Sequence, residues 1–144
     1  MSEPTDQVQV LRSAPFFADL LPKDLEGILR VGRPVSFASG ETLVEQGAVG
    51  DAMYLITEGV AEVDVGGRFH RLGQGDFFGE MALISESKRM ATVTATERVE
   101  ALRIPADAFQ SFLLDHPTVA ISMLKASVER LREVEQRIDA WMAT

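Results

Sequence analysis

The order of apolar and polar positions divides the chain into a helical start, a strand-rich middle and a helical end. Residues 6–34 are predicted to form short helices. Pro22 suits a first helical turn, and Leu25 and Ile28 follow it at helical spacing. Pro34 is predicted to end this helical segment.

The middle of the chain, residues 35–105, is predicted to form short antiparallel strands. Acidic and apolar residues alternate over 61–65, which is typical of a half-buried strand. Gly66-Gly67 then gives a two-residue hairpin signal. Later strands are expected over 91–96 and 99–104. Further glycines recur at intervals that suit a sandwich or barrel of many short strands: Gly40, Gly47, Gly50, Gly59, Gly73 and Gly75.

Residues 106–142 are predicted to form two C-terminal helices. Pro105 starts the first, and Asp115-His116-Pro117 breaks it because the residue before proline avoids the helical region. The second helix is expected to run from Pro117 to about Met142. It carries a heptad-spaced seam with one polar member: Ile121, Leu124, Val128, Leu131, Glu135, Ile138 and Met142. The predicted fold class is α+β: one domain over 1–144, with a jelly-roll-like antiparallel β-roll flanked by helices.

Composition narrows the classes of protein that fit. A chain of 144 residues suits one domain. It contains no cysteine, so disulfides and thiolate chemistry are excluded. No segment approaches the roughly 18 apolar residues that a membrane span needs, and the acidic, polar start does not resemble a signal peptide. We therefore expect a cytoplasmic protein with no membrane partner.

The net charge of −8 argues against direct DNA binding. Residues 118–144 carry equal numbers of acidic and basic side chains, so the acidic excess lies in residues 1–117. An acidic surface repels phosphates and gains no affinity from counterion release.

The strongest candidate for a binding site is residues 78–93. Gly79 and Glu80 precede a short apolar run, which predicts a glycine-led turn into a short helix. Arg89 follows nine residues after Glu80, just before a β-branched stretch. Helix N–H groups face an anion, arginine forks onto phosphate oxygens, and a carboxylate accepts from a sugar hydroxyl. The segment can therefore hold a cyclic phosphate and a ribose together.

Three sequence blocks in the right order resemble a known family. They are Gly47-Ala-Val-Gly50-Asp51-Ala-Met-Tyr54-Leu-Ile56-Thr-Glu-Gly59, Gly73-Gln-Gly75-Asp76-Phe77-Phe78-Gly79, and residues 78–93. Their pattern is similar to that of cyclic-nucleotide-binding domains, the modules of catabolite activator protein, protein kinase A regulatory subunits and nucleotide-gated channels. Residues 78–93 resemble the phosphate-binding cassette of this family.

The resemblance implies a receptor that binds cAMP, or alternatively cGMP, and performs no catalysis. Arg89 is expected to bind the cyclic phosphate, and Glu80 the ribose 2′-hydroxyl. The other expected contacts belong to the same cassette: Gly79, Met81, Ala82, Met90 and Ala91. By analogy with the family, binding rearranges the C-terminal helices and so regulates a protein effector.

Two residues bear on recognition of the base. The family usually has Ala, Ser or Thr after the arginine, whereas this chain has Met90. Methionine cannot donate a hydrogen bond to guanine, which favours cAMP, although its bulk can also narrow the pocket. Glu135, on the apolar seam, is either a solvated helix residue or, if the long helix covers the pocket, an acceptor for the base amino group.

Other functions have weaker support. His70 and His116 are the only histidines, and no cysteine or carboxylate cluster accompanies them, which argues against a cupin-type metalloenzyme. A domain that has lost its ligand and serves only in protein–protein contacts remains an alternative. The chain ends soon after the long helix, so it is either a stand-alone receptor or a domain of a larger channel, kinase or transcription regulator. The seam over 117–142 also suits a homodimer.

Overall fold

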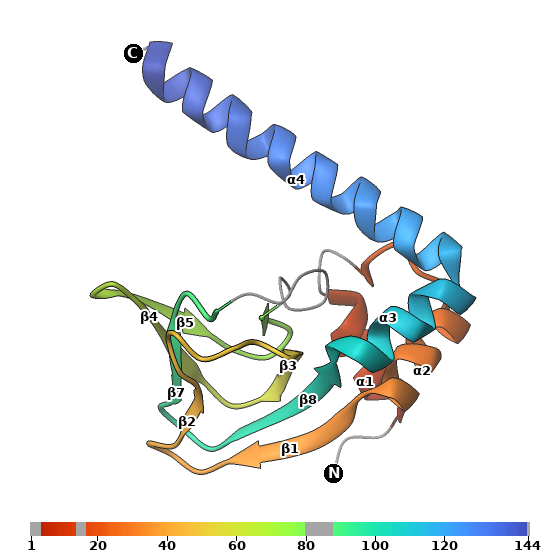
Figure 1. The fold of residues 1–144 in the computed structure, drawn as a ribbon, viewed down its shortest axis with the longest axis horizontal. Helices are drawn as coiled ribbons and strands as arrows, with labels where there is room; N and C mark the ends of the chain where they lie inside the picture. Colours follow the sequence, from red (N-terminus) through yellow and green to blue (C-terminus); the bar gives the residue numbers. More distant parts are fainter. Residues whose placement is uncertain (1–3, 14–16, 80–87, 144) are drawn as a thin grey trace.

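The computed structural model describes residues 4–13, 17–79 and 88–143, which form helices packed beside two antiparallel sheets (Figure 1). The helices are α1 (Pro4–Ser13), α2 (Pro22–Val31), α3 (Ala106–Asp115) and α4 (Pro117–Ala143). The strands are β1 (Arg33–Phe37), β2 (Thr42–Val44), β3 (Ala52–Glu58), β4 (Ala61–Val65), β5 (Arg68–Leu72), β6 (Phe77–Phe78), β7 (Thr92–Ala95) and β8 (Val99–Pro105). This arrangement confirms the predicted α+β class, including the long final helix.

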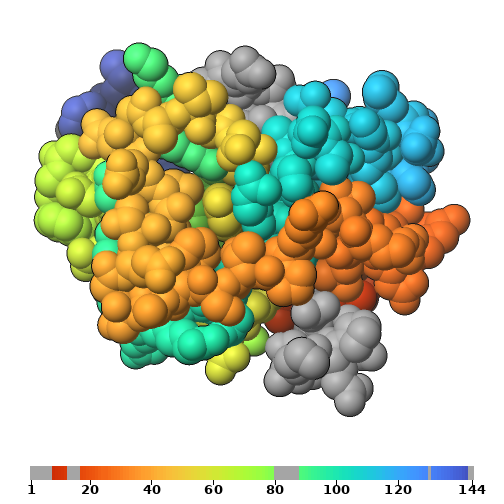
Figure 2. All heavy atoms as spheres, turned by 60° about the horizontal axis from the view of Figure 1, so that its bottom comes forward, coloured from red at the N-terminus to blue at the C-terminus, as the bar shows by residue number. Residues whose placement is uncertain are grey.

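The turn from α2 into β1 differs from the prediction. Gly32, rather than Pro34, ends α2, and its N–H donates to the Ile28 carbonyl at 3.0 Å. A Cβ on Gly32 would lie 2.6 Å from Leu102 Cγ, so only glycine allows this close approach. Pro34 lies inside β1, which is an edge strand, where a residue without an N–H group is tolerated. Figure 2 shows α2 and β1, in orange, forming one continuous surface with α3 in cyan beside them.

The strands form two four-stranded sheets, in the orders β1-β8-β3-β6 and β2-β7-β4-β5. The predicted hairpin at Gly66-Gly67 is confirmed, because Val65 pairs with Arg68 and both glycines have positive φ angles of 58° and 89°. The two later strands are also confirmed, as β7 and β8, with each end within one residue of the prediction.

Strand β3 is buried on both faces and separates two apolar cores. Met53 and Leu55 pack in a cluster with side chains of α1, α2 and α3. Tyr54 and Ile56 point the other way, into a cluster between the two sheets. This strand is therefore an uninterrupted apolar run in the sequence instead of an alternating one.

Helix α4 packs on the domain only near its start. Val119 is fully buried and Met123 packs against the helical core, whereas every side chain described from 131 to 142 is exposed. Beyond its first turns the helix extends away from the roll (Figure 1). The predicted seam is therefore an exposed apolar stripe in this structure, and we call its apolar members the α4 seam: Ile121, Leu124, Val128, Leu131, Ile138 and Met142.

Gly59, after β3, gives a test of this architecture. Its φ angle is +97°, and an added Cβ would collide with the Arg98 carbonyl oxygen. We expect Gly59→Ala to lower the free energy of unfolding by about 3 kcal/mol or more, since a strained conformation and a backbone shift both contribute. Gly40→Ala is the matched control. Gly40 has φ +87° but open space around it, so it should lose only about 1–2 kcal/mol. Urea unfolding measures both, and equal losses would contradict the steric argument.

Candidate functional site

The backbone of Arg89 is fixed by the loop before β3. The Arg89 N–H donates to the Ala48 carbonyl at 2.7 Å, and the Gly47 N–H donates to the Arg89 carbonyl at 2.9 Å. The neighbouring pair Val49 and Lys88 forms an antiparallel bridge. This short ladder holds the start of the Arg89 side chain in place, although the two segments are about 40 residues apart in the sequence.

The Arg89 guanidinium is half-buried between two glycines. Its Nη2 donates to the Ala52 carbonyl at 2.7 Å. A Cβ on Gly50 would lie 3.0 Å from the guanidinium carbon, and one on Gly79 would collide with Nη1. Gly79 also has φ +80°, a conformation that side chains rarely adopt. Both glycines therefore leave room for Arg89. Glycine at position 79 is thus needed for this packing as well as for the expected turn.

The other residues predicted for the site are only partly within the described structure. Glu80, Met81 and Ala82 lie outside the described residues. Met90 is 69% exposed and Ala91 is half-buried, and neither lines the cavity beside Arg89. That cavity has a volume of about 280 Å³ and is bordered by the loop before β3, by β2 and by Tyr54.

Two residues beside the loop before β3, Asp51 and Arg103, were not predicted. The carboxylate of Asp51 pairs with the Arg103 guanidinium at 3.1 Å, and the Asp51 carbonyl accepts the N–H of Ala106, the first residue of α3, at 2.9 Å. Burial by itself lowers the pKa of Arg103, but its hydrogen bond with Tyr54 and its contact with Asp51 outweigh burial and raise it. In the sequence, this ion pair was signalled only by an arginine among the mostly apolar residues of β8.

The structure places Glu135 on the exposed part of α4, and no residue of α4 lines the cavity beside Arg89. Its contact with a base therefore remains a prediction. Of the two histidines, His116 stacks on Phe112 and His70 is exposed in β5. Within the part of the chain that the structure describes, no group of three or more His, Asp or Glu residues could hold a metal ion. The described helices also include none that is long and apolar enough to cross a membrane.

Comparison with known proteins identifies the family. The family model of the cyclic nucleotide-binding domain matches residues 34–116. The chain is 38% identical over 122 residues to a cyclic nucleotide-gated potassium channel of Rhizobium etli, covering 85% of this chain and 34% of the channel. It is also 36% identical to a cAMP-dependent protein kinase regulatory subunit of Aspergillus fumigatus, covering 72% of this chain and 26% of that subunit. The chain thus spans about a third or less of these two relatives.

A solved structure agrees with this assignment. The N-terminal domain of a transcriptional regulator from Streptomyces coelicolor A3(2) has a TM-score of 0.79 and 32% identity, and the match covers 90% of this chain and 94% of that one. The chain therefore belongs to the cyclic nucleotide-binding domain family, as its three sequence blocks indicated.

The packing of Arg89 can be tested at Gly79. We expect Gly79→Ala to destabilise the fold more than Gly47→Ala by about 1–3 kcal/mol, because its Cβ collides with Arg89 and lies 2.9 Å from the Ala52 carbonyl. Gly47 is a close control, with φ +88° and nothing within 4 Å of its added Cβ. Urea unfolding of the two variants gives the comparison. A Gly79→Ala protein as stable as Gly47→Ala would show that Arg89 does not occupy this gap.

Proposed function

We propose that this chain is a non-catalytic receptor for a cyclic nucleotide, with cAMP as its preferred ligand. The observation that supports this most directly is the position of Arg89, held between two glycines at the end of the cassette. Ala52 accepts one of its five N–H donors, and no other described residue hydrogen-bonds to the guanidinium. A half-buried guanidinium that donates to only one of the described residues suits the two oxygens of a cyclic phosphate.

The roles of the remaining site residues follow from the family pattern. Glu80 accepts a hydrogen bond from the ribose 2′-hydroxyl, and Gly79, Met81, Ala82, Met90 and Ala91 line the phosphate and ribose. Met90 and Ala91, which do not line the cavity beside Arg89 in this structure, do so in the ligand-bound arrangement. Met90 has no donor for the guanine amino group, which supports cAMP over cGMP. The name of the Aspergillus fumigatus relative, a cAMP-dependent kinase regulatory subunit, points the same way.

Calorimetric titration of refolded, nucleotide-free protein with cAMP and cGMP tests the proposal. We expect micromolar or tighter binding of cAMP and weaker binding of cGMP. Arg89→Ala should weaken cAMP binding by about 100-fold or more, because each charge-assisted hydrogen bond contributes about 1.5–3 kcal/mol. Arg89→Lys should recover only part of this loss, since lysine keeps the charge but lacks the fork.

Arg98→Ala is the control, because Arg98 is an exposed arginine that does not line the Arg89 cavity. It should bind cAMP like the unaltered protein. If the folded protein binds neither nucleotide, or if Arg89→Ala binds as well as Arg98→Ala, the chain is a protein-interaction domain or has another ligand.

We also propose that α4 carries the signal to a protein effector. Its exposed seam is apolar and has heptad spacing, so it suits docking either over the nucleotide or on a second copy of itself. A ligand can shift α4 only as far as it binds the two arrangements with different affinity. The phosphate and ribose contacts supply such a difference if the cassette closes on the ligand.

Trp141, the only tryptophan, lies near the end of α4 and is 78% exposed. We expect cAMP to shift its fluorescence emission to shorter wavelength as the seam becomes covered. Leu131→Glu should abolish this shift while cAMP still binds, whereas Ala140→Glu, on the opposite helix face, should leave it intact. Sedimentation velocity then separates docking on the roll from a dimer, which doubles the mass. An unchanged emission spectrum in the saturated complex would contradict a movement of α4.

A further inference from the structure

A second cavity lies on the far side of β3 from the Arg89 site. This outer groove has a volume of about 380 Å³ and shares no lining residue with the cavity beside Arg89. Leu55 and Leu102 form its floor, on the sheet face that also carries the helices, and Leu29 of α2 closes one end. The groove therefore begins where α2 stops covering the sheet.

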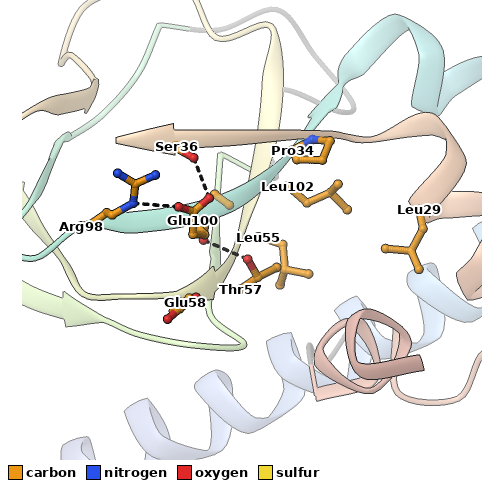
Figure 3. Close-up of a pocket in the computed structure, with 10 residues that line it drawn as sticks. Leu29, Pro34, Ser36, Leu55, Thr57, Glu58, Arg98, Glu100 and Leu102 are labelled. Carbon is orange, nitrogen blue, oxygen red and sulfur yellow. Dashed lines mark hydrogen bonds and ion pairs between the residues drawn. The ribbon is translucent and has the colours of Figure 1, made fainter. Parts of the chain in front are cut away.

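The outer groove has an apolar end and an acidic end (Figure 3). Leu29, Pro34 and Leu102 lie toward one end, and Arg98, Glu58 and Glu100 toward the other. A ligand that fills it must therefore combine an apolar group with a polar or charged one.

The acidic end carries two carboxylates that come from neighbouring strands. Glu58 of β3 and Glu100 of β8 are partners in the strand register, beside an irregularity between Ile56 and Glu58. Arg98 pairs with Glu100, so this end of the groove holds two acidic side chains and one basic side chain.

The two carboxylates differ in their hydrogen-bond partners. Glu100 accepts hydrogen bonds from the Ser36 hydroxyl at 2.6 Å and from Arg98 Nε at 2.9 Å. These hydrogen bonds lower the pKa of Glu100, so it is ionised at neutral pH. In contrast, no described residue forms a hydrogen bond or an ion pair with the Glu58 carboxylate, which is exposed. Among the described residues, the Glu58 carboxylate therefore has no partner, and it lies beside an apolar floor.

We propose that the outer groove docks a protein partner through a segment that carries an apolar side chain next to a lysine or arginine. The apolar side chain would occupy the end formed by Leu29 and Leu102, and the cation would meet Glu58. Lysine and arginine suit this place because their aliphatic stems pack on apolar surface while their charged ends stay in water. The net charge of −8 also attracts a basic segment. The inference is independent of nucleotide binding, because the groove is separate from the Arg89 site.

The test uses two short peptides and nuclear magnetic resonance of the ¹⁵N-labelled protein without nucleotide. The first peptide is acetyl-Leu-Arg-Leu-Arg-Leu-amide. The second has citrulline in place of each arginine, which removes the charge and keeps the shape. We expect the arginine peptide to give saturable shifts at the amides of Thr57, Glu100 and Leu102, and the citrulline peptide to bind at least about threefold more weakly, as an exposed ion pair allows.

Glu58→Gln should weaken binding of the arginine peptide by the same factor of at least about three. Glu58 is exposed and has no partner among the described residues, so the same substitution should leave the melting temperature unchanged, and lost binding could not then be attributed to poor folding. Glu26→Gln is the matched control, since it makes the same charge change on an exposed part of α2 outside the groove. It should leave peptide binding unchanged.

Several results would overturn the proposal. They are equal binding of the two peptides, equal effects of Glu58→Gln and Glu26→Gln, shifts confined to α4, or no saturable shift at all. Shifts of the groove amides on diluting the protein without peptide would also overturn it, because they would identify a second copy of the chain as the occupant.

Discussion

The burial of β3 on both faces is the constraint on which the rest of the structure depends. Met53 and Leu55 complete the helical core, and Tyr54 and Ile56 complete the core of the roll. The two cores cannot move apart without exposing this strand to water. The carbonyl of Ala52, at the start of β3, is therefore a fixed acceptor, and it sets the position of the Arg89 guanidinium.

The loop that leads into β3 connects the candidate nucleotide site to the C-terminal helices. Gly50 makes room for Arg89, while the next residue, Asp51, accepts the first N–H of α3 and pairs with Arg103. Because Gly50 lies against the Arg89 guanidinium, a movement of Arg89 would displace this loop first. These contacts link Arg89 to the start of α3 through the loop. In contrast, the described residues of α4 do not contact the roll beyond the first turns of the helix.

The molecule carries its apolar surface outside the cores in two different forms. The α4 seam is a long stripe with heptad spacing and suits another helix or the roll. The outer groove is short, has an acidic end, and lies on the opposite side of β3 from Arg89. The two surfaces share no residue, so substitutions can test the proposed nucleotide response and the proposed partner docking separately.

The sequence by itself determined the elements with strong local signals. The hairpin at Gly66-Gly67, the break before Pro117 and the run of α4 depend on glycine conformation, proline geometry and helical spacing, all of which act over a few residues. The family also followed from ordered motifs, and the same motifs predict Arg89 as the central residue of its site. Only the tertiary structure decided that Pro34 enters an edge strand, that Asp51 meets Arg103, and that Glu58 is opposite Glu100 in the strand register. The last two pairs join residues more than 40 positions apart, and strand register, which depends on how both sheets bury their apolar faces, brings them together.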